Sequence, residues 1–130
     1  MIQSIGYATE SATGKLKPYE FLRKNPATHE VLVAVQYCGI CHSDVHQARN
    51  EWKNTNYPCM PGHEIIGTVE KVGSQVKNFE VGEVVGIGCM INSCQTCPSC
   101  LEGLEQYCEK GATATYNGNL HGRCFNLNRF

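Results

Sequence analysis

Residues 93–108 read SCQTCPSCLEGLEQYC. They place four cysteines at spacings typical of a zinc lobe: Cys94, Cys97, Cys100 and Cys108. Four thiolates at these intervals can close a tetrahedron around Zn²⁺ with Zn–S distances of about 2.3 Å, which leaves no position for water. The alternatives are reduced thiols in an irregular loop or an iron–sulfur site, although in ferredoxin runs the fourth cysteine follows sooner and precedes a proline. We therefore expect a closed, structural zinc site that holds this segment together.

A second group of metal-ligating residue types lies upstream, in CGICHSDVH at residues 38–46 and GHE at residues 62–64. Cys41, His63 and Glu64 offer one sulfur, one nitrogen and one oxygen donor, a set that suits a zinc with exchangeable positions. Such a zinc polarises a carbonyl or lowers the pKa of a bound hydroxyl, which is catalytic work. The competing interpretation is a redox dithiol at the C-x-x-C spacing that opens the first stretch.

The side chains between these ligands indicate proton transfer and support of a metal. His42 and His46 are four apart, so on a helix they would share a face. Ser43 and His46 could pass a proton from a buried metal to solvent, and Asp44 is placed to hydrogen-bond a ligand such as His63 and set its tautomer. The plainer interpretations are ordinary surface or core histidines and an acidic residue at the start of a helix.

Short apolar runs rich in β-branched residues surround these motifs and predict a mainly antiparallel β fold. We expect strands at residues 1–8, 17–23 (a strand or a turn), 30–37, 64–72 and 83–87. Residues 41–49 lack Gly and Pro and predict two helical turns, whereas the Pro-bounded residues 50–61 predict a loop. Glycines inside the strands indicate bulges or sharp bends, as in a small curved barrel.

Composition excludes several classes of protein. The 130 residues, 42% of them hydrophobic and 18% charged, suit one compact domain. A net charge of −1 leaves no basic excess for a phosphate backbone, so we expect no nucleic-acid partner. The opening MIQSIGYATE lacks the features of a signal peptide, and no run of about 18 apolar residues occurs, so we expect no membrane association. Nine cysteines, an odd number, without a secretory signal predict reduced or metal-bound thiols and a cytoplasmic location.

Four motifs in register carry a family resemblance: GICHSDVH, PGHEIIGTVEKVG, GEVVGIGCM and SCQTCPSCLEGLEQYC. Over residues 1–118 the chain resembles the zinc-dependent alcohol dehydrogenases of the medium-chain dehydrogenase/reductase superfamily, and within them the cinnamyl alcohol dehydrogenase-like branch. The resemblance implies a GroES-like, partly open β-barrel with short helices and a four-cysteine structural-zinc lobe at residues 89–110. It also implies reversible hydride transfer between an alcohol or aldehyde and NAD(P).

The same resemblance implies two zinc ions. Cys41 and His63 would bind the catalytic zinc, with Glu64 as an alternate ligand. Asp44 would contact these ligands and not the zinc itself. The structural zinc would be held by the four cysteines of the lobe, Cys94, Cys97, Cys100 and Cys108.

The resemblance further implies roles around the substrate. Ser43 would accept the substrate hydroxyl proton, and His46 would pass it outward. His42 would lie near the cofactor pyrophosphate. Trp52 and Tyr57 fall where the family lines its substrate pocket, although as single aromatic residues they also suit ordinary packing.

The chain departs from the family in three respects. It carries no G-x-G-x-x-G phosphate turn of a Rossmann domain. The family's third protein ligand to the catalytic zinc is a cysteine well beyond position 130, and neither His121 nor Cys124 lies in a matching motif. The similarity also fades after about residue 118. We therefore expect residues 1–130 to form one GroES-like catalytic domain with a truncated or divergent tail and no Rossmann cofactor domain.

These features predict the zinc-binding catalytic domain of an NAD(P)-dependent alcohol dehydrogenase or aldehyde reductase, inactive as this isolated chain because the cofactor carries the hydride. The branch favours NADP, and the substrate in a full-length context is a small alcohol or aldehyde. The alternative is a non-catalytic, stand-alone GroES-like zinc module used for interaction or assembly. The sequence leaves the oligomeric state open.

Overall fold

The computed structural model describes residues 1–120 and 123–124, with side chains described through residue 118. The elements in chain order are β1 (Ile2–Ala8), β2 (Lys17–Arg23), β3 (Val31–Gly39), α1 (His42–Ala48), β4 (Glu64–Val72), β5 (Val84–Ile87), β6 (Met90–Asn92), α2 (Pro98–Leu101), the 3-10 helix η1 (Glu105–Tyr107), β7 (Thr113–Ala114), β8 (Asn119–Leu120) and β9 (Arg123–Cys124). The mainly β prediction is confirmed, and residues 17–23 form a strand rather than a turn. His121 lies outside the described residues, as does the side chain of Cys124, and so does most of the predicted divergent tail.

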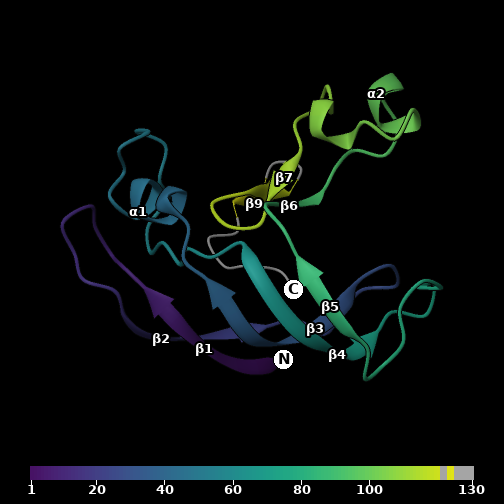
Figure 1. Cartoon of the computed structure of the whole chain (residues 1–130), viewed down its shortest axis with the longest axis horizontal. Coiled ribbons are helices and arrows are strands. Elements are labelled where there is room, and N and C mark those ends of the chain that lie inside the picture. The colour runs from purple at the N-terminus through teal and green to yellow at the C-terminus, as the bar shows by residue number, and fades with distance from the viewer. Residues whose placement is uncertain (121–122, 125–130) are drawn as a thin grey trace.

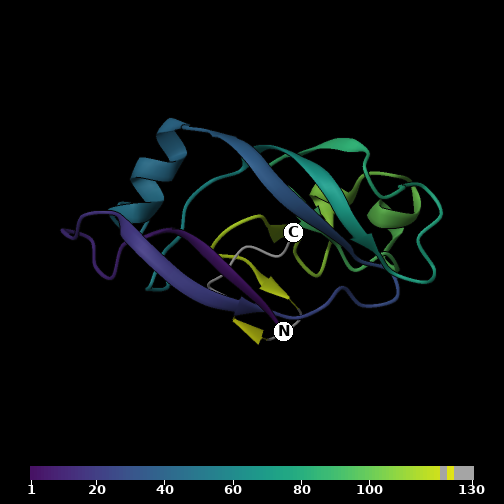
Figure 2. The ribbon, with the colours of Figure 1, turned by 90° about the horizontal axis from the view of Figure 1, so that it is seen from below.

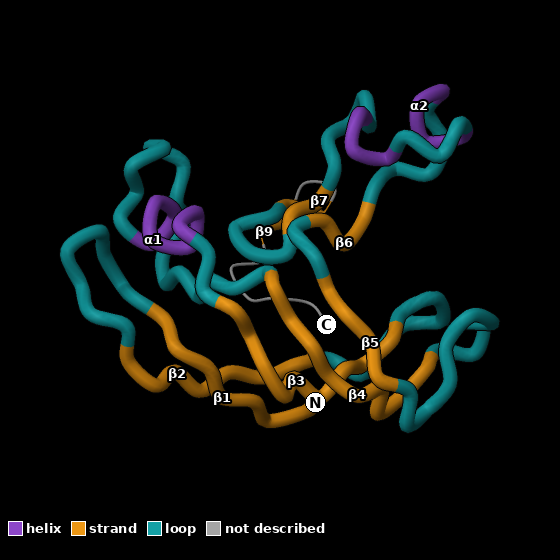
Figure 3. The backbone as a smooth tube through the Cα atoms, viewed as in Figure 1, coloured by secondary structure: helices purple, strands orange, loops and turns teal. Residues whose placement is uncertain are grey.

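The described strands form four separate antiparallel sheets (Figures 1 and 3). β1 pairs with β2, and the central sheet has the order β3-β4-β5. Short ladders join β6 to β7 and β8 to β9. These ladders do not join into one continuous barrel, so the partly open form of the predicted barrel is the one observed.

The central sheet bends where the sequence supplies glycine. The β3–β4 register shifts between Leu32 and Val33 and again between Val35 and Tyr37. Gly67 of β4 lies in this region, and a Cβ at that position would collide with the carbonyl oxygen of Ala34. The backbones therefore approach more closely than any other residue type permits, which is how the glycine produces the curvature.

The core is small and includes residues of the central sheet. Ile65 and Val69 of β4 are buried at 4% and 1% exposure. The end of β1 is tied to a distant loop by a two-way backbone bridge, in which Thr9 N–H donates to the Cys59 carbonyl at 2.9 Å and Cys59 N–H donates to Thr9 at 2.8 Å. The predicted loop at residues 50–61 is thereby anchored at its far end to β1.

Two excursions leave this framework. α1 and the loop that follows it lie at one end of the molecule, and the lobe that carries α2 and η1 lies at the other (Figures 1 and 2). The buried cluster inside the lobe consists of Cys97, Cys100 and Cys108 with Cys94 packed against it, so this segment has a sulfur-lined core in place of an aliphatic one. Among the described helices, none is both long and apolar enough to cross a membrane.

Candidate functional site

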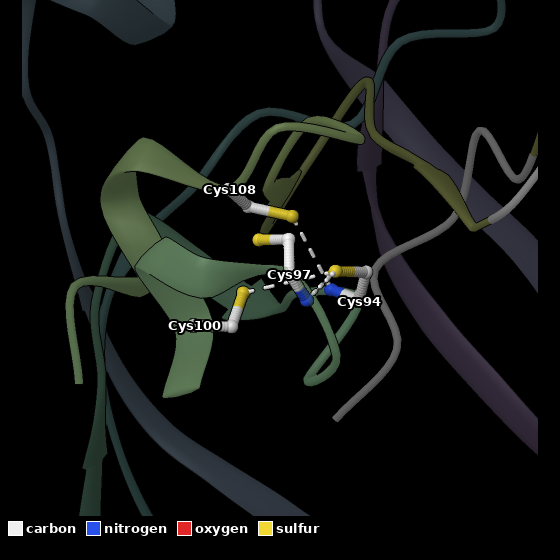
Figure 4. Close-up of side chains that lie close together, drawn as sticks. All are labelled: Cys94, Cys97, Cys100 and Cys108. Atoms are coloured by element: carbon white, nitrogen blue, oxygen red, sulfur yellow. Dashed lines mark hydrogen bonds between the residues drawn. The ribbon is translucent and has the colours of Figure 1, made fainter. Parts of the chain in front are cut away.

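The four lobe cysteines converge on one point (Figure 4). Their Sγ atoms all lie within 4.8 Å of one another. The Cys94 and Cys100 sulfurs are 3.8 Å apart. A tetrahedron with Zn–S arms of about 2.3 Å places its sulfurs about 3.8 Å apart, so this pair already has the separation that zinc requires. The sulfurs therefore fit a structural zinc in number, type and spacing.

Backbone groups stabilise the thiolate at the head of the lobe. Thr96 N–H and Cys97 N–H donate to Cys94 Sγ at 3.5 and 3.3 Å. The Thr96 hydroxyl donates to the same sulfur at 3.6 Å. The Thr96 backbone donor makes the largest contribution, and together these bonds lower the pKa of Cys94 to about 5. Gln95 supports the turn with a left-handed φ of 59°. A thiolate at neutral pH is the form that binds metal.

The second cluster forms at one end of the β3–β4 pair. Gly39 and Glu64 are register partners, so the residues just after β3 and just before β4 meet in space. Cys41, which precedes α1, is thus brought beside His63 and Glu64. One ligand atom from each of the three lies within 4.8 Å of the other two. The structure brings together the predicted sulfur, nitrogen and oxygen donors, which fit a zinc with exchangeable positions.

Asp44 holds this cluster in place. Its carboxylate is buried, at 8% side-chain exposure, and accepts three hydrogen bonds. Oδ2 accepts from Cys41 N–H at 2.8 Å, and Oδ1 accepts from Gly62 N–H at 3.0 Å and lies 3.1 Å from His63 Nδ1. Because a carboxylate only accepts, Nδ1 carries the hydrogen, and Nε2 of His63 is left to bind a metal. The predicted contact between Asp44 and His63 is present.

Ser43 and His46 lie beside the cluster on α1. Ser43 Oγ donates to Cys41 Sγ at 3.1 Å. His46 contacts Trp52 at 5.4 Å between ring centroids and His42 at 4.6 Å. His46 Nδ1 also forms a short contact with the Glu51 carboxylate. That hydrogen bond is the main cause of the lowered pKa of Glu51.

Sequence reasoning missed Glu51. It follows the end of α1, and its position five residues after His46 corresponds to no regular helical contact. The feature of the sequence that could have predicted this contact is an acidic residue in the turn that follows a helix with two histidines on one face.

A cavity of about 340 Å³ opens next to the second cluster. His63 of the second cluster and Ser43 line it, and the rest of the lining comprises Gln47, Trp52, Asn54, Cys89, Ala114, Tyr116 and Asn117. Trp52 lines it as predicted. Tyr57 is absent from the lining and instead donates its hydroxyl to the Ala48 carbonyl at 2.8 Å.

Tyr116 was also missed by sequence reasoning. It belongs to the segment after the lobe, yet its ring lies 5.4 Å from that of His63. Burial raises the pKa of Tyr116, and a hydrogen bond to the Ser43 side chain opposes that effect. No local pattern links residue 116 to residues 43 and 63, since only tertiary packing brings them together.

Comparison with known proteins identifies the same architecture. The profile described as "Alcohol dehydrogenase GroES-like domain" matches residues 27–126. A probable cinnamyl alcohol dehydrogenase 6 of Arabidopsis thaliana is 48% identical over 125 residues, which cover 96% of this chain and 34% of that protein. Aldehyde reductase YahK of Escherichia coli is 49% identical over 107 residues, covering 82% of this chain and 30% of that protein.

Solved structures agree. A cinnamyl alcohol dehydrogenase, SbCAD4, from Sorghum bicolor superimposes with a TM-score of 0.90 at 40% identity, over 98% of this chain and 36% of that one. A Helicobacter pylori CAD complexed with NADP(H) gives a TM-score of 0.85 at 44% identity, over 96% of this chain and 34% of that one. The chain thus spans about a third of the length of the relatives it matches.

Proposed function

This chain belongs to the alcohol dehydrogenase GroES-like domain family, and on that basis we propose that it supplies the zinc-binding catalytic region of an NAD(P)-dependent alcohol dehydrogenase or aldehyde reductase. The observation that carries the proposal is the meeting of Cys41, His63 and Glu64 beside a cavity that Ser43 also lines. A purely structural zinc module needs the four-cysteine lobe alone. The second cluster has no such use, so it favours the enzyme over the non-catalytic alternative.

In the proposed reaction Cys41, His63 and Glu64 would hold a zinc ion. Zinc bound there supplies Lewis-acid chemistry, polarising a substrate carbonyl or lowering the pKa of a substrate hydroxyl. Asp44 keeps His63 in the tautomer that presents Nε2, and its bond to Cys41 N–H sets the position of the thiolate.

The chain's own hydroxyl and imidazole groups move the proton. Ser43 has one hydrogen and two lone pairs, so it can accept the substrate hydroxyl proton while it gives up its own. His46 then carries the proton outward from the site. The Glu51 carboxylate stabilises the imidazolium that forms, because the contact between them places opposite charges side by side.

The hydride partner in this proposal is a nicotinamide dinucleotide. The Helicobacter pylori relative in complex with NADP(H) supports NADP, and we place His42 near the cofactor pyrophosphate. Because residues 1–130 contain no G-x-G-x-x-G turn, we propose that they do not bind the dinucleotide or turn over substrate on their own. The proposed substrate is a small alcohol or aldehyde.

Metal analysis of the purified 130-residue chain tests the site. We expect two zinc ions per chain, and we expect Cys41→Ser to lose one of them while Cys89→Ser, a cavity cysteine outside both clusters, keeps both. Retention of both ions by Cys41→Ser would contradict the catalytic cluster. An NADPH-dependent aldehyde-reduction assay on the same zinc-loaded chain tests the second part, and measurable turnover would overturn the expected inactivity of the isolated region.

A further inference from the structure

The side chain of Asn117 joins two segments that lie far apart in the sequence. Its Oδ1 accepts a hydrogen bond from Asn56 N–H at 2.8 Å, and its Nδ2 donates to the Asn54 carbonyl at 3.0 Å. Both partners are backbone groups, one that only donates and one that only accepts. The amide therefore cannot exchange its oxygen for its nitrogen. We call these two bonds the Asn117 clamp.

The clamp holds the loop that follows α1 against the segment that follows the lobe. Asn54 and Asn117 both line the cavity, and Trp52 lies in the same loop. The Thr55 hydroxyl donates to the Gln47 carbonyl at 2.6 Å, so the loop is tied to α1 on one side and to residue 117 on the other. Opening the clamp removes the second of these ties.

The fold has a structural use for both residues of the pair Asn117–Gly118. Asn117 has a left-handed φ of 52°, a conformation that asparagine adopts more readily than most residue types. A Cβ at Gly118 would collide with the Ala114 carbonyl oxygen, so a larger residue would have to move the backbone. Clamp and packing together therefore place glycine directly after this asparagine.

Asparagine followed by glycine is also the asparagine sequence most prone to lose its side-chain amide nitrogen. The backbone nitrogen of the next residue can attack the amide carbon Cγ, and glycine hinders this attack least because it has no Cβ. Asn117–Gly118 is the only such pair among the 130 residues. Within the described part of the chain, nothing accepts a hydrogen bond from Gly118 N–H, so the attacking nitrogen is not held in place there.

We propose that Asn117 is a deamidation site and that its conversion releases the loop after α1. The Gly118 nitrogen forms a bond to Asn117 Cγ and loses its proton. The Cγ–Nδ2 bond breaks, and ammonia leaves with that proton. Water then opens the resulting succinimide at one of its two carbonyls, which gives isoaspartate or aspartate at position 117. The reaction consumes only water and involves no change of oxidation state.

Conversion destroys the donor half of the clamp. Both oxygens of an ionised aspartate only accept, so one of them would face the Asn54 carbonyl and repel it. Isoaspartate in addition lengthens the backbone by one carbon. Because the side chain must leave its two partners before Cγ can react, the reaction proceeds from an opened state, and the product cannot close again. The inference goes beyond the proposed function, since neither zinc nor a dinucleotide takes part.

Peptide mapping by mass spectrometry measures the modification. The folded 130-residue chain is incubated with zinc at neutral pH beside a sample unfolded in urea, and the asparagine, aspartate and isoaspartate forms are quantified at each position. In the folded chain we expect Asn117 to convert roughly tenfold faster than Asn78, an exposed asparagine followed by Phe79. We expect slower conversion than in urea, because the clamp must open first.

Two results of this measurement would overturn the inference. Conversion of Asn117 no faster than that of Asn78 would show that it is not a preferred site. Conversion as fast in the folded chain as in urea would show that the clamp does not hold the side chain.

Hydrogen exchange on the Asn117→Asp chain measures the release of the loop. We expect the N–H groups of Thr55 and Asn56 to exchange roughly tenfold faster than in the unsubstituted chain, while β3 and β4 keep their protection. Asn78→Asp makes the same substitution at an exposed position between β4 and β5 and is the matched control. Equal exchange of the two N–H groups in both variants would contradict the role given to the clamp.

The aged sample gives the same comparison without a substitution. Deamidated chains carry one more negative charge, so ion exchange separates them from unconverted chains that folded in the same way. Faster exchange of Thr55 and Asn56 in the deamidated fraction supports the release of the loop, and equal exchange contradicts it. This comparison decides the question even if Asn117→Asp does not fold.

Discussion

Asp44 Oδ1 lies 3.1 Å from His63 Nδ1, and this contact joins the first turn of α1 to the residue just before β4. The same carboxylate accepts the N–H groups of Cys41 and Gly62. One buried anion therefore orients a predicted zinc ligand, caps a helix and fixes a turn.

Asp44→Asn should weaken both zinc binding and folding. An amide nitrogen in place of one carboxylate oxygen faces a backbone N–H or the imidazole N–H, which leaves a buried donor unpaired at a cost of about 1–3 kcal/mol. Loss of a supporting carboxylate typically reduces metal affinity roughly 10–100-fold. Urea denaturation and chelator competition measure the two effects. Glu70→Gln, an exposed carboxylate on β4, is the control and should change neither; an Asp44→Asn chain with the zinc affinity of that control would contradict the role given to Asp44.

Gly62→Ala should disturb the same region through the backbone. Gly62 has φ of +130°, and a Cβ there would lie 2.8 Å from Cys38 Sγ. We expect a loss of about 1–3 kcal/mol in the free energy of unfolding, because an L-residue is strained in this conformation. Gly88→Ala serves as the matched control, since nothing lies within 4 Å of a Cβ at Gly88. Equal denaturation midpoints for the two variants would show that residue 62 is not strained.

Cys94 and Cys59 should react with iodoacetamide at very different pH. Hydrogen bonds from Thr96 lower the pKa of Cys94 to about 5, whereas burial raises the pKa of Cys59 to about 11. In metal-free protein at pH 7 we therefore expect Cys94 to be alkylated as a thiolate while Cys59 stays unmodified. Mass spectrometry of the two peptides at a series of pH values measures this. Alkylation of Cys59 ahead of Cys94 would contradict the assignment.

The lowered pKa of Cys94 also makes the stability of the metal-free protein depend on pH. In the unfolded chain the thiol has its ordinary pKa of 9.0, so the folded state binds fewer protons between that value and about 5. The contribution of Cys94 to metal-free stability is complete above pH 9, declines as the pH falls and is lost below pH 5. Cys94→Ser should remove this part of the pH dependence of unfolding. If the pH dependence of unfolding is the same in that variant, Cys94 does not cause it and the prediction is wrong.

Removing the lobe metal should lower the stability of the folded lobe, so that the lobe opens more often than the sheets do. Its core is made of cysteines, so few apolar side chains remain to hold it once the sulfurs separate. We expect Cys100→Ser to lose one tightly held zinc and to expose amides of residues 93–110 to hydrogen exchange, while β3 and β4 stay protected. Cys89→Ser is the matched control. Simultaneous loss of protection in the lobe and the central sheet would contradict an independently stabilised lobe.

Local patterns accounted for most of the elements. Residues 41–49 predicted two helical turns, and α1 occupies His42–Ala48 with Cys41 and Arg49 as its caps. The β-branched run at residues 64–72 corresponds to β4 residue for residue. These predictions succeeded because helix ends and strand runs depend on neighbours within a few residues.

Other features depended on distant parts of the chain. Asn117 Nδ2 donates to the Asn54 carbonyl, which lies 63 positions earlier in the chain. Tyr116 follows the lobe in sequence, yet its ring packs beside that of His63, which precedes the lobe. Nothing in the spacing of either residue marks it as part of a cavity. The contact of Glu51 with His46 was missed for a related reason, because a turn after a helix has no fixed periodicity.

The sequence by itself determined the two sets of metal donors. The lobe cysteines are separated by short intervals that only a local loop has to close, and the family motifs identify Cys41, His63 and Glu64. Tertiary structure alone decided that those three donors meet, because the pairing of Gly39 with Glu64 brings two chain segments to one end of a ladder.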